Sequence, residues 1–117
     1  MIQQSKWKWY GYPGHLCVAQ WCQFHLCTEV GKFLISTVGD YRPVSERKGE
    51  SFGPMKEVGC NRMFETFVFR WKNRCDIKEC GCGLPKIIPS EIDTLGANTA
   101  KEATVNHYKL CLKYARE

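Results

Sequence analysis

The stretch QFHLCTEVGKFLISTV, residues 23–38, decides the fold. From Gln23 to Val30 the side chains alternate between two sets, which is the period of a strand with one buried face. Gly31 then supplies a turn, and Lys32–Val38 is rich in β-branched and aromatic residues, which favour strands. The stretch therefore predicts a β-hairpin that turns around Gly31.

A second strand signal lies at residues 62–71, RMFETFVFRW, where both faces are apolar. Apolar residues on both faces are typical of a strand in the middle of a sheet. Glu65 and Thr66 interrupt this pattern. Because a buried carboxylate needs a partner, Glu65 is expected to pair with Arg62, Arg70 or a histidine.

The segment 98–115 predicts a C-terminal α-helix. Thr99 followed by Glu102 is a capping box, in which the hydroxyl accepts from the amide three residues on. Together with the strands, this helix predicts an α+β fold: a small antiparallel sheet of three to five strands with the one C-terminal helix packed on it. The helix face expected against the sheet carries Ala103, His107, Leu110, Cys111 and Tyr114.

The length of 117 residues favours a single domain, 1–117. Hydrophobic residues make up 44% and charged residues 25%, which excludes a long disordered chain. Around the sheet and helix we expect an aromatic and basic N-terminal arm over 1–14, a mobile loop over 40–59 and a cysteine-rich loop over 73–90.

The cysteine content is high for the compartment that the sequence indicates. No apolar run approaches the roughly 18–20 residues of a membrane span, and the N-terminus has no secretory signal pattern. We therefore expect a cytoplasmic protein with no membrane contact. Because stable disulfides are rare in the cytosol, the eight cysteines are expected to form a metal site, buried thiols or a reactive thiol.

The most specific motif is C-x4-C-x-C, formed by Cys75, Cys80 and Cys82 with a glycine after each of the last two. Three thiolates so close in sequence suit a structural zinc ion whose fourth ligand comes from elsewhere, with Cys60 as the first candidate. Reduced thiols without a metal are the main alternative, and a disulfide or redox role is a third. Further candidates for the fourth ligand are Cys111 and His107 on the predicted helix.

A thiol enzyme is a further hypothesis, centred on Cys22, His25 and Cys27. An imidazole beside a thiol lowers the thiol pKa, and His25 and Cys27 share one face of the predicted strand. A histidine of the core or the surface is the alternative. The sequence contains no G-x-G-x-x-G, phosphate loop or H-E-x-x-H motif, so we assign no catalytic residue and no cofactor besides zinc.

The N-terminal arm combines rings with basic side chains. Rings offer flat faces to bases and lysines meet phosphates, so the arm is a candidate site for nucleic acid or a nucleotide. It can equally anchor a protein partner, or form a strand whose rings lie against the sheet. The net charge of +5 permits contact with a polyanion but does not require it. The candidate binding residues are Trp7, Trp9, Tyr10, Tyr12, Lys6 and Lys8.

Four motifs, taken in order, resemble an uncharacterised set of small proteins encoded by tailed bacteriophages and prophages. The resemblance runs from about Gly14 to Tyr114 and implies a viral origin and the cytoplasm of a bacterial host cell. It implies no catalytic residue. The motifs are GHLCVAQWCQFHL (14–26), ISTVGDY (35–41), GCNRMFETFVF (59–69) and TAKEATVNHYKLC (99–111).

The leading functional hypothesis is a small phage accessory protein that acts by binding a host or phage protein, for example by inhibiting a host defence component. Its basis is the small size, the many aromatic residues, the lack of a catalytic signature and the phage resemblance. The alternatives are a nucleic-acid or nucleotide-binding module, a thiol- or metal-dependent enzyme, and a component of the virion.

Overall fold

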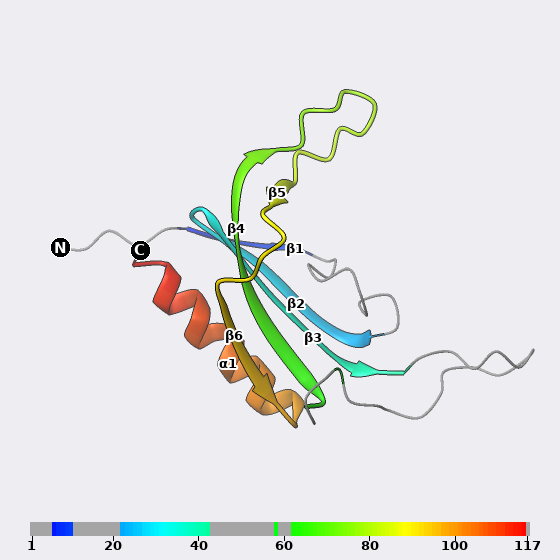
Figure 1. Cartoon of the computed structure of the whole chain (residues 1–117), viewed down its shortest axis with the longest axis vertical. Coiled ribbons are helices and arrows are strands. Elements are labelled where there is room, and N and C mark those ends of the chain that lie inside the picture. The colour runs from blue at the N-terminus through cyan, green and yellow to red at the C-terminus, as the bar shows by residue number, and fades with distance from the viewer. Residues whose placement is uncertain (1–5, 11–21, 43–57, 59–61, 117) are drawn as a thin grey trace, which may run out of the picture.

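The computed structural model describes residues 6–10, 22–42, 58 and 62–116 of the chain. Over these residues the backbone forms one open antiparallel sheet with a single helix packed against it (Figure 1). This is the α+β architecture that the sequence predicts, although the sheet has six strands where three to five were expected.

The long strand β4 organises the sheet. The elements are β1 (Trp7–Tyr10), β2 (Cys22–Val30), β3 (Phe33–Tyr41), β4 (Phe64–Arg74), β5 (Pro85–Ile87), β6 (Asp93–Ala97) and α1 (Ala100–Tyr114). The strand order is β1-β2-β3-β4-β5, and β6 also pairs with β4. The first half of β4 pairs with β6 and its last residues pair with β5. The β4–β5 end therefore projects away from the region that α1 covers (Figure 1).

The hairpin predicted over residues 23–38 is present as β2 and β3. The strands pair from Val30 opposite Phe33 outward, and Gly31 lies in the turn. The φ angle of Gly31 is 59°, a left-handed conformation that glycine adopts without steric cost. The turn residue named from the sequence is therefore the one that the backbone geometry requires.

β3 continues beyond the predicted hairpin to Tyr41. In this extension Gly39 lies opposite Phe64 of β4. Glycine lets the Phe64 ring pack against the β3 backbone, because a Cβ atom at position 39 would overlap that ring. The loop expected over 40–59 thus begins with two strand residues. Most of the rest of that segment, 43–57 and 59, lies outside the described residues.

Two short strands lie where the sequence predicted none. The cysteine-rich loop expected over 73–90 contains the end of β4 and the whole of β5, so the connection is shorter than predicted. β6 was not predicted because DTLGA carries an aspartate and a glycine, both disfavoured in strands. It forms because β4 offers it a complementary backbone edge, a tertiary effect that local sequence does not show.

The C-terminal helix expected within 98–115 is present as α1, over Ala100–Tyr114. The backbone N–H of Glu102 donates to the Thr99 hydroxyl at 3.1 Å, and that hydroxyl donates to the Glu102 carboxylate at 3.3 Å. In the part of the chain that the structure describes, no helix has both the length and the apolar character needed to cross a membrane. The buried helix residues are the ones expected: Ala103, His107, Leu110, Cys111 and Tyr114.

A polar chain crosses the core between α1 and the sheet. The two ring nitrogens of His107 lie 2.8 Å from the Thr28 hydroxyl and 2.7 Å from the Thr37 hydroxyl, and Thr37 in turn lies 2.7 Å from Thr66. All four residues are buried. Burial lowers the pKa of His107 to about 4, so the imidazole is neutral near pH 7 and satisfies both threonines.

Candidate metal centre

The three cysteines of the C-x4-C-x-C motif lie in the connection between β4 and β5. Its base is closed where Arg74 pairs with Pro85 and where the backbone N–H of Cys75 donates to the Leu84 carbonyl at 2.7 Å. Between these residues every side chain from Asp76 to Gly83 is exposed. The connection therefore has little apolar burial to hold it.

Two backbone features fold this connection back on itself. The N–H groups of Cys80 and Gly81 both donate to the Ile77 carbonyl, at 3.1 and 3.0 Å. Gly81 and Gly83 have φ angles of 65° and 61°, the left-handed region that favours glycine. A Cβ at Gly83 would meet no atom within 4 Å, so a side chain would fit there. Glycine is favoured at this position because of its positive φ angle and not because of a lack of space. These turns place Cys80 and Cys82 facing Cys75.

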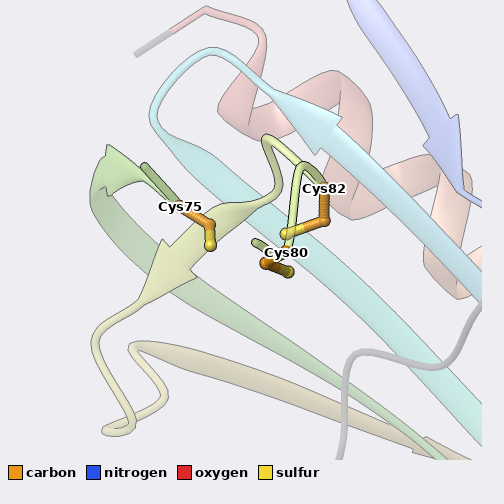
Figure 2. A group of neighbouring side chains, drawn as sticks. All are labelled: Cys75, Cys80 and Cys82. Carbon is orange, nitrogen blue, oxygen red and sulfur yellow. The ribbon is translucent and has the colours of Figure 1, made fainter. Parts of the chain in front are cut away.

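The three sulfur atoms converge. All three Sγ atoms lie within 4.8 Å of one another, and Figure 2 shows the side chains pointing into a common space. Tetrahedral zinc with Zn–S bonds near 2.3 Å sets sulfur atoms about 3.8 Å apart. Because the cysteines sit on an exposed turn, adjustments of about 1 Å would bring them to that spacing. The three cysteines are therefore a candidate set of ligands for one ion.

Hydrogen bonds favour a thiolate at this group. The backbone N–H of Leu84 is the main cause that lowers the pKa of Cys82, and thiol donors at Cys80 and Cys75 lower it further. The pKa of Cys80 is raised, chiefly because its thiol donates to Cys82. One negative charge is therefore stabilised on Cys82 by its neighbours, and a metal ligand must likewise be deprotonated.

The fourth ligand expected from the sequence, Cys60, lies outside the described residues. Arg62, two positions later, lies over Gly96 of β6. That is the end of β4 remote from Cys75, and a strand of eleven residues is roughly 33 Å long. Nothing in the structure tests the assignment of Cys60 directly.

The other two candidates for the fourth ligand do not lie with the group. Both ring nitrogens of His107 are engaged by threonines under α1. Cys111 is fully buried among apolar residues that include Val30 and Leu110. Both residues belong to α1, which lies away from the β4–β5 connection (Figure 1).

The thiols named for a thiol enzyme are protonated at neutral pH. Burial raises the pKa of Cys22 to about 11 and that of Cys27 to about 12. The Nδ1 atom of His25 is buried and has no hydrogen-bond partner within the described residues, so it does not contact a thiol there. These environments disfavour the thiolate that nucleophilic catalysis requires.

Three aromatic residues of the predicted arm, Trp7, Trp9 and Tyr10, lie on the edge strand β1. Trp7 and Trp9 lie on the side of α1, with ring centroids 6.4 Å apart, and both rings contact Tyr108. Lys8 lies over the ring of Tyr10, whose hydroxyl donates to Glu29. Lys6 is exposed, and Tyr12 lies outside the described residues. The strand thus separates the tryptophans from the lysine between them.

A hollow of about 340 Å³ beside β4 and β6 was not anticipated from the sequence. Glu65 lines it together with Arg62 and Glu91, and burial, followed by the charge of Glu91, raises the pKa of Glu65. The interrupted apolar pattern of β4 was the only signal of this hollow. Its other half depends on β6, which the sequence did not predict.

Comparison with protein families, curated proteins and solved structures finds no match to this chain. The fold and the site define a small α+β protein whose β4–β5 hairpin gathers three cysteines. The resemblance to bacteriophage proteins, and the inhibition of host defence that it suggested, stay predictions.

Proposed function

We propose that this is a zinc-binding protein in which Cys75, Cys80 and Cys82 hold one zinc ion in the connection between β4 and β5, residues 75–84, which we call the hairpin tip. The observation that carries this proposal is the convergence of three Sγ atoms within 4.8 Å of one another on an exposed turn. Soft thiolate ligands favour zinc over the hard cations that prefer oxygen.

The role of the ion in this proposal is structural. β5 has three residues, and the connection before it is exposed, so burial contributes little to its order. A metal ion that links three points of such a segment replaces the missing core, because its binding free energy becomes folding free energy. With the ion bound, the hairpin tip is a rigid surface suited to contact with a partner.

Arg74 connects this tip to the sheet. Its guanidinium donates to both oxygens of Glu29, at 2.9 and 2.7 Å, and to the Gly83 carbonyl at 3.4 Å. It also lies 4.7 Å from the ring centroid of Trp71. The same side chain therefore holds both the base of the hairpin and a residue of the cysteine turn. This anchor supports a tip with one fixed orientation when metal is bound.

Zinc content of the purified protein tests the proposal. We expect one zinc per chain by native mass spectrometry, with loss of the ion in the double variant Cys80→Ser, Cys82→Ser. The matched control is Cys27→Ala, which removes a cysteine that lies in the core. Cys60→Ser tests the fourth ligand in the same experiment. A weaker zinc affinity would assign that role to Cys60, and an unchanged affinity, which the position of Arg62 at the far end of β4 favours, would exclude it.

Two results would contradict the proposal. One is a protein that binds no zinc after reduction and incubation with the ion. The other is a double variant, folded by circular dichroism, that retains zinc with the affinity of the parent protein.

A further inference from the structure

We propose that the face formed by β1 and the adjoining side of α1 binds single-stranded nucleic acid by stacking unpaired bases on Trp9 and Tyr108. This surface lies apart from the cysteine group, and the inference does not depend on zinc. It rests on the exposure and arrangement of the rings and on the charge of the segments that carry them.

The rings are exposed and held in place. Trp9 and Tyr108 are each 44% exposed, and their ring centroids lie 5.6 Å apart. Trp9 stacks on the buried His107 ring with a centroid distance of 5.4 Å and an interplanar angle of 30°. The tryptophan therefore rests on a fixed support while a large part of its surface faces solvent. Trp7 contacts both rings and completes the cluster.

Beyond the rings, exposed apolar side chains continue along the helix. Val105, Tyr108 and Leu112 follow each other at intervals of three and four residues, which places them on one stripe of α1. They are 46%, 44% and 46% exposed. With Trp9, they account for four of the seven large hydrophobic side chains that are exposed among the described residues. A concentration of this kind marks an interaction surface.

The charge of these two segments favours a polyanion. Residues 6–10 and 103–116 contain five basic residues and no aspartate or glutamate. The acidic residue of α1, Glu102, lies in its first turn, where it accepts from the Thr99 hydroxyl of the cap. Two of the five have partners, since Lys113 donates to Asp93 and Lys8 lies over Tyr10. The other three, all exposed, are Lys6, Lys109 and Arg116.

Single strands fit this surface better than the other candidate partners do. Base stacking on protein rings requires unpaired bases, which a duplex does not offer. A protein partner that covers the apolar stripe would need acidic groups to match the surrounding basic side chains. Exposed rings next to basic residues, with no acidic residue in 6–10 or 103–116, are the combination that single-stranded nucleic acid uses.

Fluorescence anisotropy of a labelled oligodeoxythymidine of about 12 nucleotides tests the inference with the full-length, zinc-loaded protein. We expect Tyr108→Ala to weaken binding roughly fivefold to 150-fold, and Tyr108→Phe to retain most of the affinity. The matched control is Ile88→Ala, an exposed apolar side chain (46%) outside this face. Trp9→Ala should weaken binding to a similar extent, provided that unfolding experiments show it to be folded.

Charge variants give a second, independent measurement. We expect the affinity to fall with salt concentration with a logarithmic slope of about −2, corresponding to three basic contacts. The double variant Lys109→Glu, Arg116→Glu should weaken binding at every salt concentration tested. Lys72→Glu, an exposed lysine on β4, serves as the control.

Three outcomes would overturn the inference. The first is a lack of binding to the oligonucleotide at low salt. The second is binding that Tyr108→Ala leaves unchanged, or equal binding of heparin, because either result reduces the contact to charge alone. The third is an acidic peptide that binds more tightly than the oligonucleotide and depends on the same rings, which would identify a protein as the partner.

Discussion

The described cysteines lie in two regions of the molecule, which shift the thiol pKa in opposite directions. Cys22, Cys27 and Cys111 are buried in or against the sheet, and burial raises their pKa to about 11, 12 and 12. The other three converge at the exposed hairpin tip, where the backbone N–H of Leu84 and neighbouring thiols lower the pKa of Cys82.

This contrast shows that the backbone, and not the cysteine itself, decides whether a thiol is available for chemistry. In the core, a thiol packs as a small apolar group and stays protonated. At the tip, left-handed glycines turn the chain so that an amide and two thiols face one sulfur. The four predictions below test how separate the two regions are.

The largest expected difference is in the rate of alkylation by iodoacetamide in the metal-free, folded protein. An increase of three pKa units, from 9 to about 12, lowers the thiolate fraction of Cys27 and Cys111 about a thousandfold near pH 7. Steric burial slows these thiols further. We therefore expect Cys82 to be labelled more than about a thousandfold faster, as measured by peptide mapping over time. Similar alkylation rates for Cys27 and Cys82 would contradict the proposed difference in thiol reactivity between the core and the hairpin tip.

The second prediction concerns acid sensitivity of the core. The folded pKa of His107, about 4, lies below the unfolded value of 6.5, so the unfolded chain binds more protons between these pH values. Stability should therefore fall as the pH decreases from about 6.5 to 4, by about 3 kcal/mol from this residue. Urea unfolding at several pH values measures the loss.

His107→Gln is the reference for that experiment, because glutamine cannot be protonated in this range. The difference between the two pH profiles isolates the histidine from carboxylates that also titrate in acid. Profiles with the same slope between pH 4 and 6.5 would show that His107 is not buried as a neutral ring.

The third prediction compares serine substitutions in the two regions without metal. Cys111→Ser replaces a thiol that is hydrogen-bonded to Thr28 inside a buried cluster by a more polar hydroxyl, and burying that hydroxyl should cost about 1–3 kcal/mol. Cys80→Ser changes an exposed side chain, and surface substitutions have effects within about 0.5 kcal/mol. Chemical unfolding with chelator present measures both variants. Equal destabilisation would indicate that the tip is part of the cooperative core even without metal.

The smallest expected effect comes from the helix cap. Thr99→Ala removes the acceptor for the Glu102 amide and should lower the free energy of unfolding by about 1 kcal/mol. The control is Thr104→Ala, whose hydroxyl donates only to the Ala100 carbonyl within the helix. The zinc affinity should not change in Thr99→Ala, because α1 lies apart from the hairpin tip. A matching loss of zinc affinity would show that the two regions are coupled.

The elements that the sequence predicted best depend on local pattern. The helical face of α1 follows directly from spacing, and the β2–β3 turn follows from Gly31. The convergence of Cys75, Cys80 and Cys82 was also predictable. The three cysteines lie within eight residues, and the interleaved glycines allow the tight turns that bring their side chains together. In each case the signal lies within one short segment.

What the sequence did not show depends on contacts between distant segments. β6 exists because it pairs with β4, and the support of Trp9 by His107 joins the two ends of the chain. The threonines that satisfy His107 come from two strands, and a third strand adds Thr66, which contacts Thr37. Each of the three appears in the sequence as an isolated polar residue on an apolar strand face. The sequence did contain one signal of this polar chain. Threonines recur on the predicted strands, and the predicted helix carries a histidine on its buried face.

X-ray absorption spectroscopy of the zinc-loaded protein tests the central claim most directly, since it measures the atoms bound to the metal. The account predicts a first shell with at least three sulfur atoms at about 2.3 Å, and no change in that shell when the core residue Cys27 is replaced by alanine. A shell of nitrogen and oxygen alone, or one with a single sulfur, would contradict the account, because the tip cysteines would then not hold the ion together.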